Sequence, residues 1–119
     1  MSHIVSIRTK VQDIVAVAAA CHRLGLAAPF HGTARLFGGE ASGVLVQFPG
    51  WRYPAIIDTT SGEVRFDNYA GQWGDRKNLD RFLQLYAVEK AKLEARKKGH
   101  VVTETLLQDG SIRVQIATV

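Results

Sequence analysis

The last third of the chain constrains the fold most, because a long helical pattern there stops at a glycine and a hairpin pattern follows. Apolar residues recur at helical spacing from Leu79 to Leu93, and cations gather in the final turns, where they complement the negative end of a helix dipole. Gly99 then ends the helix, since glycine readily adopts the left-handed conformation of a helix C-terminus. Either Asp75 or Asn78 supplies the N-cap, which gives a helix of about 21 residues.

A hairpin is predicted directly after this helix. Asp109-Gly110 suits a type I′ turn, in which both central residues have positive φ. This turn predicts three cross-strand pairs: Leu107 with Ile112, Thr105 with Val114, and Thr103 with Ile116. The predicted core face then carries Leu107, Ile112, Val114 and Ile116, and the wetter face carries Glu104, Arg113 and Gln115.

The first part of the chain reads as a strand followed by a helix. Residues 4–9 alternate as a strand does, and Thr9 with Gln12 has the spacing of a capping box. A stripe from Val11 to Ala19 predicts a helix over residues 10–24, which Gly25 ends.

The middle of the chain is predicted to be rich in strands, at residues 33–37, 44–48, 53–58 and 63–66. The predicted order is therefore β-α-β-β-β-β-α-β-β in a single domain spanning residues 1–119. Helices separated by antiparallel meanders predict an α+β fold, with both helices packed on one face of an antiparallel sheet in a ferredoxin-like or related arrangement. The order of the strands in the sheet is not readable from the sequence.

Composition restricts the class of protein. With 119 residues, of which 46% are hydrophobic and 22% charged, the chain is an ordinary globular domain. Its single cysteine, Cys21, excludes an internal disulfide and a cysteine-rich metal site. The most apolar run spans residues 14–21, far short of the ~20 residues of a membrane helix. No signal peptide is visible, so we expect a cytoplasmic protein.

The chain resembles a known family along nearly its whole length. The segments that carry the resemblance are residues 67–75 (DNYAGQWGD), 82–84 (FLQ), 86–91 (YAVEKA), 99–102 (GHVV) and 109–112 (DGSI), with the opening residues 1–3 (MSH) and 7–10 (IRTK). Together they resemble domain-of-unknown-function family 1257, whose plastid and cyanobacterial members are the ycf-thirty-five-like proteins. The resemblance implies a small α+β protein without an assigned activity or catalytic residues. It also implies an accessory role beside a MoxR-type AAA+ ATPase or a von Willebrand A-domain protein.

The segment 67–75 is the best candidate for a binding site. It combines carboxylate, amide, phenol and indole groups immediately before a helix N-terminus. In one interpretation Tyr69 and Trp73 pack over a sheet edge while the aspartates cap turns. In the other interpretation, Tyr69 and Trp73 anchor a protein partner, as interface hot spots do. The predicted partner-binding residues are Asp67, Asn68, Tyr69, Trp73, Asp75, Arg76 and Lys77.

A nucleic-acid-binding module is the alternative function. The net charge of +4 permits it, and cations gather near the end of the second helix. The predicted contacts are Trp51, Arg52, Lys90, Arg96, Lys97 and Lys98. Glu89 and Glu94 interrupt the helix cations, however, and such i, i+4 pairs often only solvate a helix face.

Catalytic chemistry has little support in the sequence. The four histidines lack metal-ligand spacing, and Cys21 is expected to be a small residue buried in the core. No metal, cofactor or catalytic residue is therefore predicted. A deep pocket joining His31, Asp58 and Asp67 would favour a small-molecule-binding protein or an enzyme. We therefore expect a non-enzymatic interaction module, and self-association through an exposed edge at residues 112–119 is a further expectation.

Overall fold

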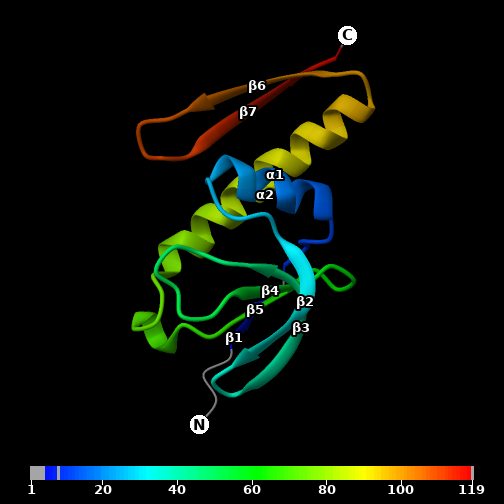
Figure 1. Cartoon of the computed structure of the whole chain (residues 1–119). Helices are drawn as coiled ribbons and strands as arrows, with labels where there is room; N and C mark the ends of the chain where they lie inside the picture. The colour runs from blue at the N-terminus through cyan, green and yellow to red at the C-terminus, as the bar shows by residue number, and fades with distance from the viewer. Residues whose placement is uncertain (1–4, 8, 119) are drawn as a thin grey trace.

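The computed structural model describes residues 5–7 and 9–118, and it confirms the predicted α+β class and element order (Figure 1). The helices are α1 (Ile14–Arg23), the short 3₁₀ turn η1 (Tyr69–Gly71) and α2 (Arg76–Lys97). The strands are β1 (Val5–Ile7), β2 (Phe30–Leu36), β3 (Gly39–Val46), β4 (Ala55–Asp58), β5 (Glu63–Phe66), β6 (Val101–Leu106) and β7 (Ile112–Ala117).

Five strands form one antiparallel sheet in the order β1-β5-β4-β3-β2. Strands β2 to β5 follow one another as a meander, and β1 adds to the outside of β5. A ferredoxin-like sheet instead interleaves strands from two β-α-β units. The fold is therefore a related α+β arrangement with a simpler strand order.

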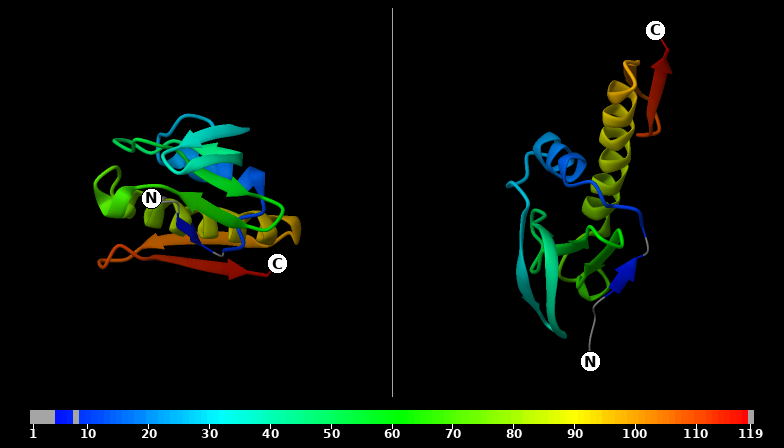
Figure 2. Two further views of the ribbon diagram at one scale, coloured as in Figure 1. Left: turned by 90° about the horizontal axis from the view of Figure 1, so that it is seen from below. Right: turned by 90° about the vertical axis from the view of Figure 1, so that its right-hand side faces the viewer.

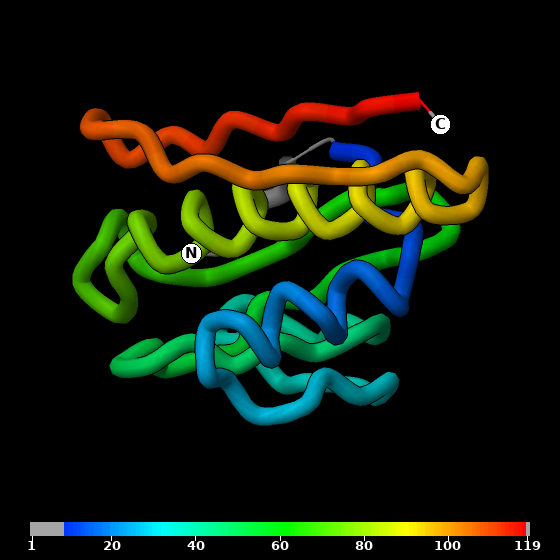
Figure 3. The backbone as a smooth tube through the Cα atoms, turned by 90° about the horizontal axis from the view of Figure 1, so that it is seen from above, coloured from blue at the N-terminus to red at the C-terminus, as the bar shows by residue number. Residues whose placement is uncertain are grey.

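Both helices cover the same face of this sheet. Val44, Ile57 and Val64 lie in register across β3, β4 and β5, and all three are buried in the main core. Val17 of α1 and Phe82 of α2 pack into the same core, and the two helices contact each other side by side (Figure 3). The opposite face has a smaller cluster, formed by Ala34, Leu36, Ala41, Leu45 and Ile56.

The second half of α2 leaves the sheet, and the β6–β7 hairpin lies along it as a separate two-stranded sheet (Figure 2). The prediction of a single antiparallel layer is wrong in this respect. The molecule measures 53 × 31 × 23 Å, and its radius of gyration is 15.2 Å. A compact domain of this length would have about 13.5 Å. We call the second half of α2 with β6 and β7 the arm.

Ion pairs fasten the arm to α1. The guanidinium of Arg23 donates two hydrogen bonds to the carboxylate of Glu104 on β6, at 3.0 and 2.7 Å, and Lys92 of α2 lies 2.9 Å from the same carboxylate. These cations, with Arg23 contributing most, lower the pKa of Glu104 to about 2. Glu104 was predicted on the wetter face of the hairpin, but it faces the helices.

The hairpin register differs by one residue from the predicted one. The observed pairs are Leu106 with Ile112, Glu104 with Val114, and Val102 with Ile116. The amide of Gly110 donates to the carbonyl of Leu107, and only Gly110 has positive φ (+86°) in this turn. The turn is therefore a three-residue loop with a glycine bulge, and the type I′ prediction is wrong because Asp109 stays at negative φ.

An aspartate is the N-cap of each helix. Asp75 caps α2 by accepting a hydrogen bond from the amide of Lys77, which was one of the two predicted caps. Asp13, not Thr9, caps α1, so the helix begins four residues later than predicted. The side chains of Thr9 and Gln12 instead donate to the carbonyls of Gly62 and Thr60, tying this segment to the β4–β5 turn.

Candidate functional site

The loop at residues 67–75 connects β5 to α2 and is folded on itself by Asn68. The carbonyl of Asn68 accepts hydrogen bonds from the amides of Gly71 and Trp73, at 3.0 and 2.9 Å. Its side-chain amide donates to the carbonyl of Gly74 at 3.3 Å. Asn68 is buried (7% exposed), so it holds the loop together instead of contacting a partner.

Gly74 fixes the loop to the core. A β-carbon at this position would lie 2.5 Å from the ring of Trp51, so only glycine permits this approach. Trp51 is itself buried against Phe48 and Phe66, and its indole N–H donates to the carbonyl of Asp75. The end of the loop is thereby held against a rigid aromatic core.

The tip of the loop is strained. Tyr69 and Ala70 have φ of 47° and 52°, which residues other than glycine rarely adopt. They are the only such residues in the described ranges 5–7 and 9–118. Strain of this kind costs about 1–3 kcal/mol per residue and persists where the surrounding structure enforces it, often at binding sites.

The strained tip presents Tyr69 to a cluster of aromatic rings centred on Trp73. The ring centroid of Trp73 lies 4.7 Å from that of Tyr69, 5.4 Å from Phe37 and 5.7 Å from Tyr53. The guanidinium of Arg52 lies 4.9 Å from the Trp73 ring centroid. We call these five residues the Trp73 cluster.

Three separate connections contribute to the Trp73 cluster. Phe37 comes from the β2–β3 turn, Arg52 and Tyr53 from the β3–β4 connection, and Tyr69 and Trp73 from the β5–α2 loop. The amide of Arg52 donates to the carbonyl of Trp73 at 2.8 Å, which joins the last two connections. Phe37 is 56% exposed, and the tyrosines and Trp73 are partly exposed. The cluster is therefore an aromatic surface and not a closed core.

Asp67, at the start of the loop, is fully buried, and neither carboxylate oxygen has a hydrogen-bond partner within the described residues. A buried polar group without a partner is costly, and in native proteins it calls for a specific explanation. The prediction that Asp67 contacts a partner directly is not compatible with its burial in this conformation.

The remaining predicted partner residues lie at the start of α2. Asp75 is used as the N-cap, and Arg76 lies over the ring of Phe66 while pairing with Asp80. Lys77 is exposed. These three charged residues lie where the loop meets α2, and all three are exposed.

The residues predicted to bind nucleic acid are not brought together. Trp51 is 5% exposed and cannot stack on a base, because core rings cover it. Arg52 belongs to the Trp73 cluster, whereas Lys98 follows the far end of α2, a helix of about 33 Å. Lys90 and Lys97 are paired with Glu94, whereas Arg96 and Lys98 are exposed and have no ion pair within the described part of the chain.

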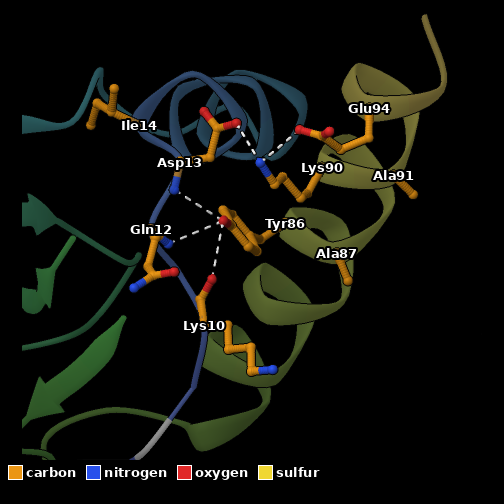
Figure 4. A pocket seen from close by; sticks show the side chains of 9 residues that line it. All are labelled: Lys10, Gln12, Asp13, Ile14, Tyr86, Ala87, Lys90, Ala91 and Glu94. Atoms are coloured by element: carbon orange, nitrogen blue, oxygen red, sulfur yellow. Dashed lines mark hydrogen bonds and ion pairs between the residues drawn. The ribbon is translucent and has the colours of Figure 1, made fainter. Parts of the chain in front are cut away.

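A groove runs between the segment before α1 and the middle of α2 (Figure 4). It is open, with a volume of about 740 Å³, and Ile14, Ala87 and Ala91 line part of it. Its polar groups already bond to one another. The hydroxyl of Tyr86 accepts from the amides of Gln12 and Asp13 and donates to the carbonyl of Lys10.

Lys90 and the carboxylates beside it in the groove are satisfied in the same way. Lys90 pairs with Asp13 and Glu94 at 3.0 and 2.9 Å. These carboxylates raise the pKa of Lys90, with Glu94 contributing most. The contacts of Tyr86 and Lys90 stabilise the packing of α1 against α2, and among the charged side chains that line the groove only Lys10 has no ion pair within the described residues.

The residues considered for catalysis lie apart. Asp58 accepts hydrogen bonds from the amides of Thr60 and Ser61 and so caps a turn. In the strand register, Asp58 of β4 lies opposite Glu63 at one end of β5. Asp67 follows the other end of β5, about 13 Å away along the strand. His31 is exposed on the edge strand β2. These three groups do not converge on one pocket.

Cys21 is buried, as predicted, and burial raises the pKa of its thiol to about 11, so the thiol remains protonated and unreactive at neutral pH. Within the ranges 5–7 and 9–118, no group of three or more metal-ligating side chains is close enough to hold a metal ion. No helix among these residues is both long and apolar enough to cross a membrane.

Sequence reasoning missed Phe37 and Tyr53 as members of the site, and it assigned Arg52 to nucleic acid. One signal was present: Phe37 is a large apolar residue directly before the turn glycines Gly38 and Gly39, where a polar residue is usual. Arg52 and Tyr53 are distant in sequence from the loop at residues 67–75, and only the sheet register brings them close to it.

Comparisons of the chain with protein-family models, with curated proteins and with solved structures find no match. The geometry of the Trp73 cluster is therefore the basis of the functional argument, and the family resemblance remains an expectation from the quoted residues.

Proposed function

We propose that this protein is a non-enzymatic interaction module that binds a protein partner through the Trp73 cluster. The observation that carries the proposal is the gathering of four aromatic rings and a guanidinium, from three connections, on a partly exposed surface. Tryptophan, tyrosine and arginine are the residues most enriched in interface hot spots.

Two further features of the loop support the proposal. The positive φ values of Tyr69 and Ala70, and the buried carboxylate of Asp67, each cost stability. A loop that served only to connect β5 to α2 would not need either feature. Retaining both at one loop is what we expect where a surface is shaped for binding.

The kind of partner is suggested by the family resemblance alone. It favours a MoxR-type AAA+ ATPase or a von Willebrand A-domain protein encoded in the same genome, for which this chain would act as an accessory subunit. No cofactor is needed for this role.

Affinity capture from the native host tests the proposal. We would compare the wild type with Trp73→Ala and with Phe37→Ser, which removes the exposed ring of the cluster. The matched control is Phe30→Ser, since Phe30 is 64% exposed at the start of β2, whereas Phe37 directly follows the end of that strand. Circular dichroism would verify that each variant is folded.

The proposal predicts that specific partners are lost with Trp73→Ala and Phe37→Ser and kept with Phe30→Ser. Equal recovery with all four proteins would show that the cluster is not the binding surface. A complex that dissociates steeply with salt, but not on removal of the aromatic rings, would favour the nucleic-acid alternative.

A further inference from the structure

The arm has an unpaired strand edge at β7. Within the described residues β7 pairs only with β6, and it lies outermost on the arm, with β6 over α2 (Figures 2 and 3). Proteins usually protect such an edge with proline, charged side chains such as lysine, or a bulge. The strand Ile112–Ala117 contains one charged residue, Arg113, and no proline or lysine, and its pairing with β6 continues without interruption.

The hydrogen-bonding groups of this edge can be assigned from the turn. The amide of Leu107 donates to the carbonyl of Ser111 at 2.9 Å. Bonded pairs alternate with non-bonded pairs along an antiparallel ladder, so Arg113, Gln115 and Ala117 direct their backbone groups toward β6. Ile112, Val114 and Ile116 therefore direct their N–H and C=O groups outward.

The side chains of these same three residues lie on the face toward α2, which α2 covers only in part. Ile112 and Val114 are half-buried, but Ile116 is 49% exposed, and Leu106, opposite Ile112 on β6, is 68% exposed. An isolated two-stranded ribbon is marginally stable, and an apolar face left partly in water weakens it further.

The edge of β7 is complementary to itself. With a two-fold axis at Val114, each Ile112 lies opposite Ile116 of the second copy, so all three outward residues form bonded pairs, giving about six new hydrogen bonds. Arg113, the only charged residue of the strand, lies opposite the neutral Gln115 of the second copy. No like charges meet in this register.

We propose that two copies of this chain associate through β7 to form a four-stranded sheet β6-β7-β7-β6 with both α2 helices on one face. The turn of each hairpin lies near the middle of its own α2, where Gln84 donates to the carbonyl of Gly110. Antiparallel pairing therefore places the two five-stranded sheets at opposite ends of the dimer. It presents two Trp73 clusters, so the dimer would be bivalent for its partner.

Sedimentation equilibrium of the purified chain tests this dimer, with charge changes at Gln115. Gln115→Arg places like charges opposite each other twice and should weaken dimerisation about tenfold. Gln115→Glu places a carboxylate opposite Arg113 twice and should strengthen it by a similar factor. The matched control is Thr103→Arg, which adds the same charge on the same face, one strand away from the edge, and should change the dissociation constant less than threefold.

Amide hydrogen exchange gives an independent readout of the register. The amides of Ile112, Val114 and Ile116 should become protected as protein concentration rises, whereas those of Arg113 and Gln115 should be protected at all concentrations. A chain that stays monomeric up to roughly millimolar concentration would overturn the proposal. So would a dimer that responds equally to Gln115→Arg, Gln115→Glu and Thr103→Arg, because it would use another surface.

Discussion

Replacing Tyr86 by phenylalanine removes one oxygen atom that joins the segment before α1 to the middle of α2. The side chain is 6% exposed, and its ring remains in the core after the change. The hydroxyl accepts from the amide of Asp13 at 3.1 Å and of Gln12 at 3.2 Å, and it donates to the carbonyl of Lys10 at 3.4 Å (Figure 4).

The expected loss of stability follows from these three contacts. A hydrogen bond of ordinary geometry contributes about 0.5–1.5 kcal/mol, and the contact of 3.4 Å is too long to add much. The two amides lie at an open groove, so water can reach them after the change and recover part of the loss. We therefore expect Tyr86→Phe to lower the free energy of unfolding by about 1–2 kcal/mol.

Urea denaturation followed by circular dichroism measures this difference at pH 7. The matched control is Tyr53→Phe, because Tyr53 is partly exposed and its hydroxyl makes no hydrogen bond within the described part of the chain. The control should change the free energy of unfolding by less than about 0.5 kcal/mol. A loss for Tyr86→Phe no larger than that of the control would refute the reasoning.

Three further predictions concern stability. The pKa of Glu104 is about 2 in the folded chain against an ordinary 4.5, so its ion pairs stabilise the fold above pH 4.5 and are lost as pH falls toward 2. The wild type should therefore have a free energy of unfolding about 1–2 kcal/mol higher than Glu104→Gln near pH 6, after allowance for solvent screening. Urea titrations should show this difference disappear by about pH 2. Asp67→Asn should raise the free energy of unfolding by about 1 kcal/mol, because it removes a buried carboxyl group that has no hydrogen-bond partner within the described residues, and an unchanged or lower denaturation midpoint would contradict this. Gly74→Ala should lower the free energy of unfolding by about 1–3 kcal/mol, because the added methyl group overlaps the ring of Trp51. A melting temperature equal to that of the wild type would contradict this and show that the loop can shift away from Trp51.

Much of the fold could be predicted because its elements have local signals. The helical stripe from Leu79 to Leu93 predicts α2, and Asp75, one of its two predicted caps, is the cap observed. The start of α1 was predicted wrongly because Thr9 and Gln12 have capping chemistry but bond to the β4–β5 turn, a tertiary contact without a local signal.

The hairpin shows a different limit of sequence reasoning. Asp109-Gly110 fits both a two-residue turn and a three-residue loop with a glycine bulge. The two turns differ by one residue in register, and this difference moves Glu104 to the helix face, where Arg23 and Lys92 bind it. The choice between registers therefore depends on residues more than ten positions away.

The candidate site could be predicted only in part. The aromatic and polar composition of residues 67–75 indicates a binding loop, and Tyr69 and Trp73 do lie on the surface it forms. Phe37 and Tyr53 join them although the β2–β3 turn and the β3–β4 connection lie at opposite ends of β3, so the contact depends on how the β2–β3 hairpin packs. Such convergence depends on strand order, which the sequence does not reveal.

A binding titration with the purified partner tests the role of the Trp73 cluster most directly. The wild type, Phe37→Ser and Phe30→Ser would be compared by isothermal calorimetry at constant salt. The account predicts that Phe37→Ser weakens binding by about tenfold or more, since it removes an exposed ring from a hot spot, while Phe30→Ser stays within about twofold of the wild type. Equal affinities for all three proteins would contradict the account.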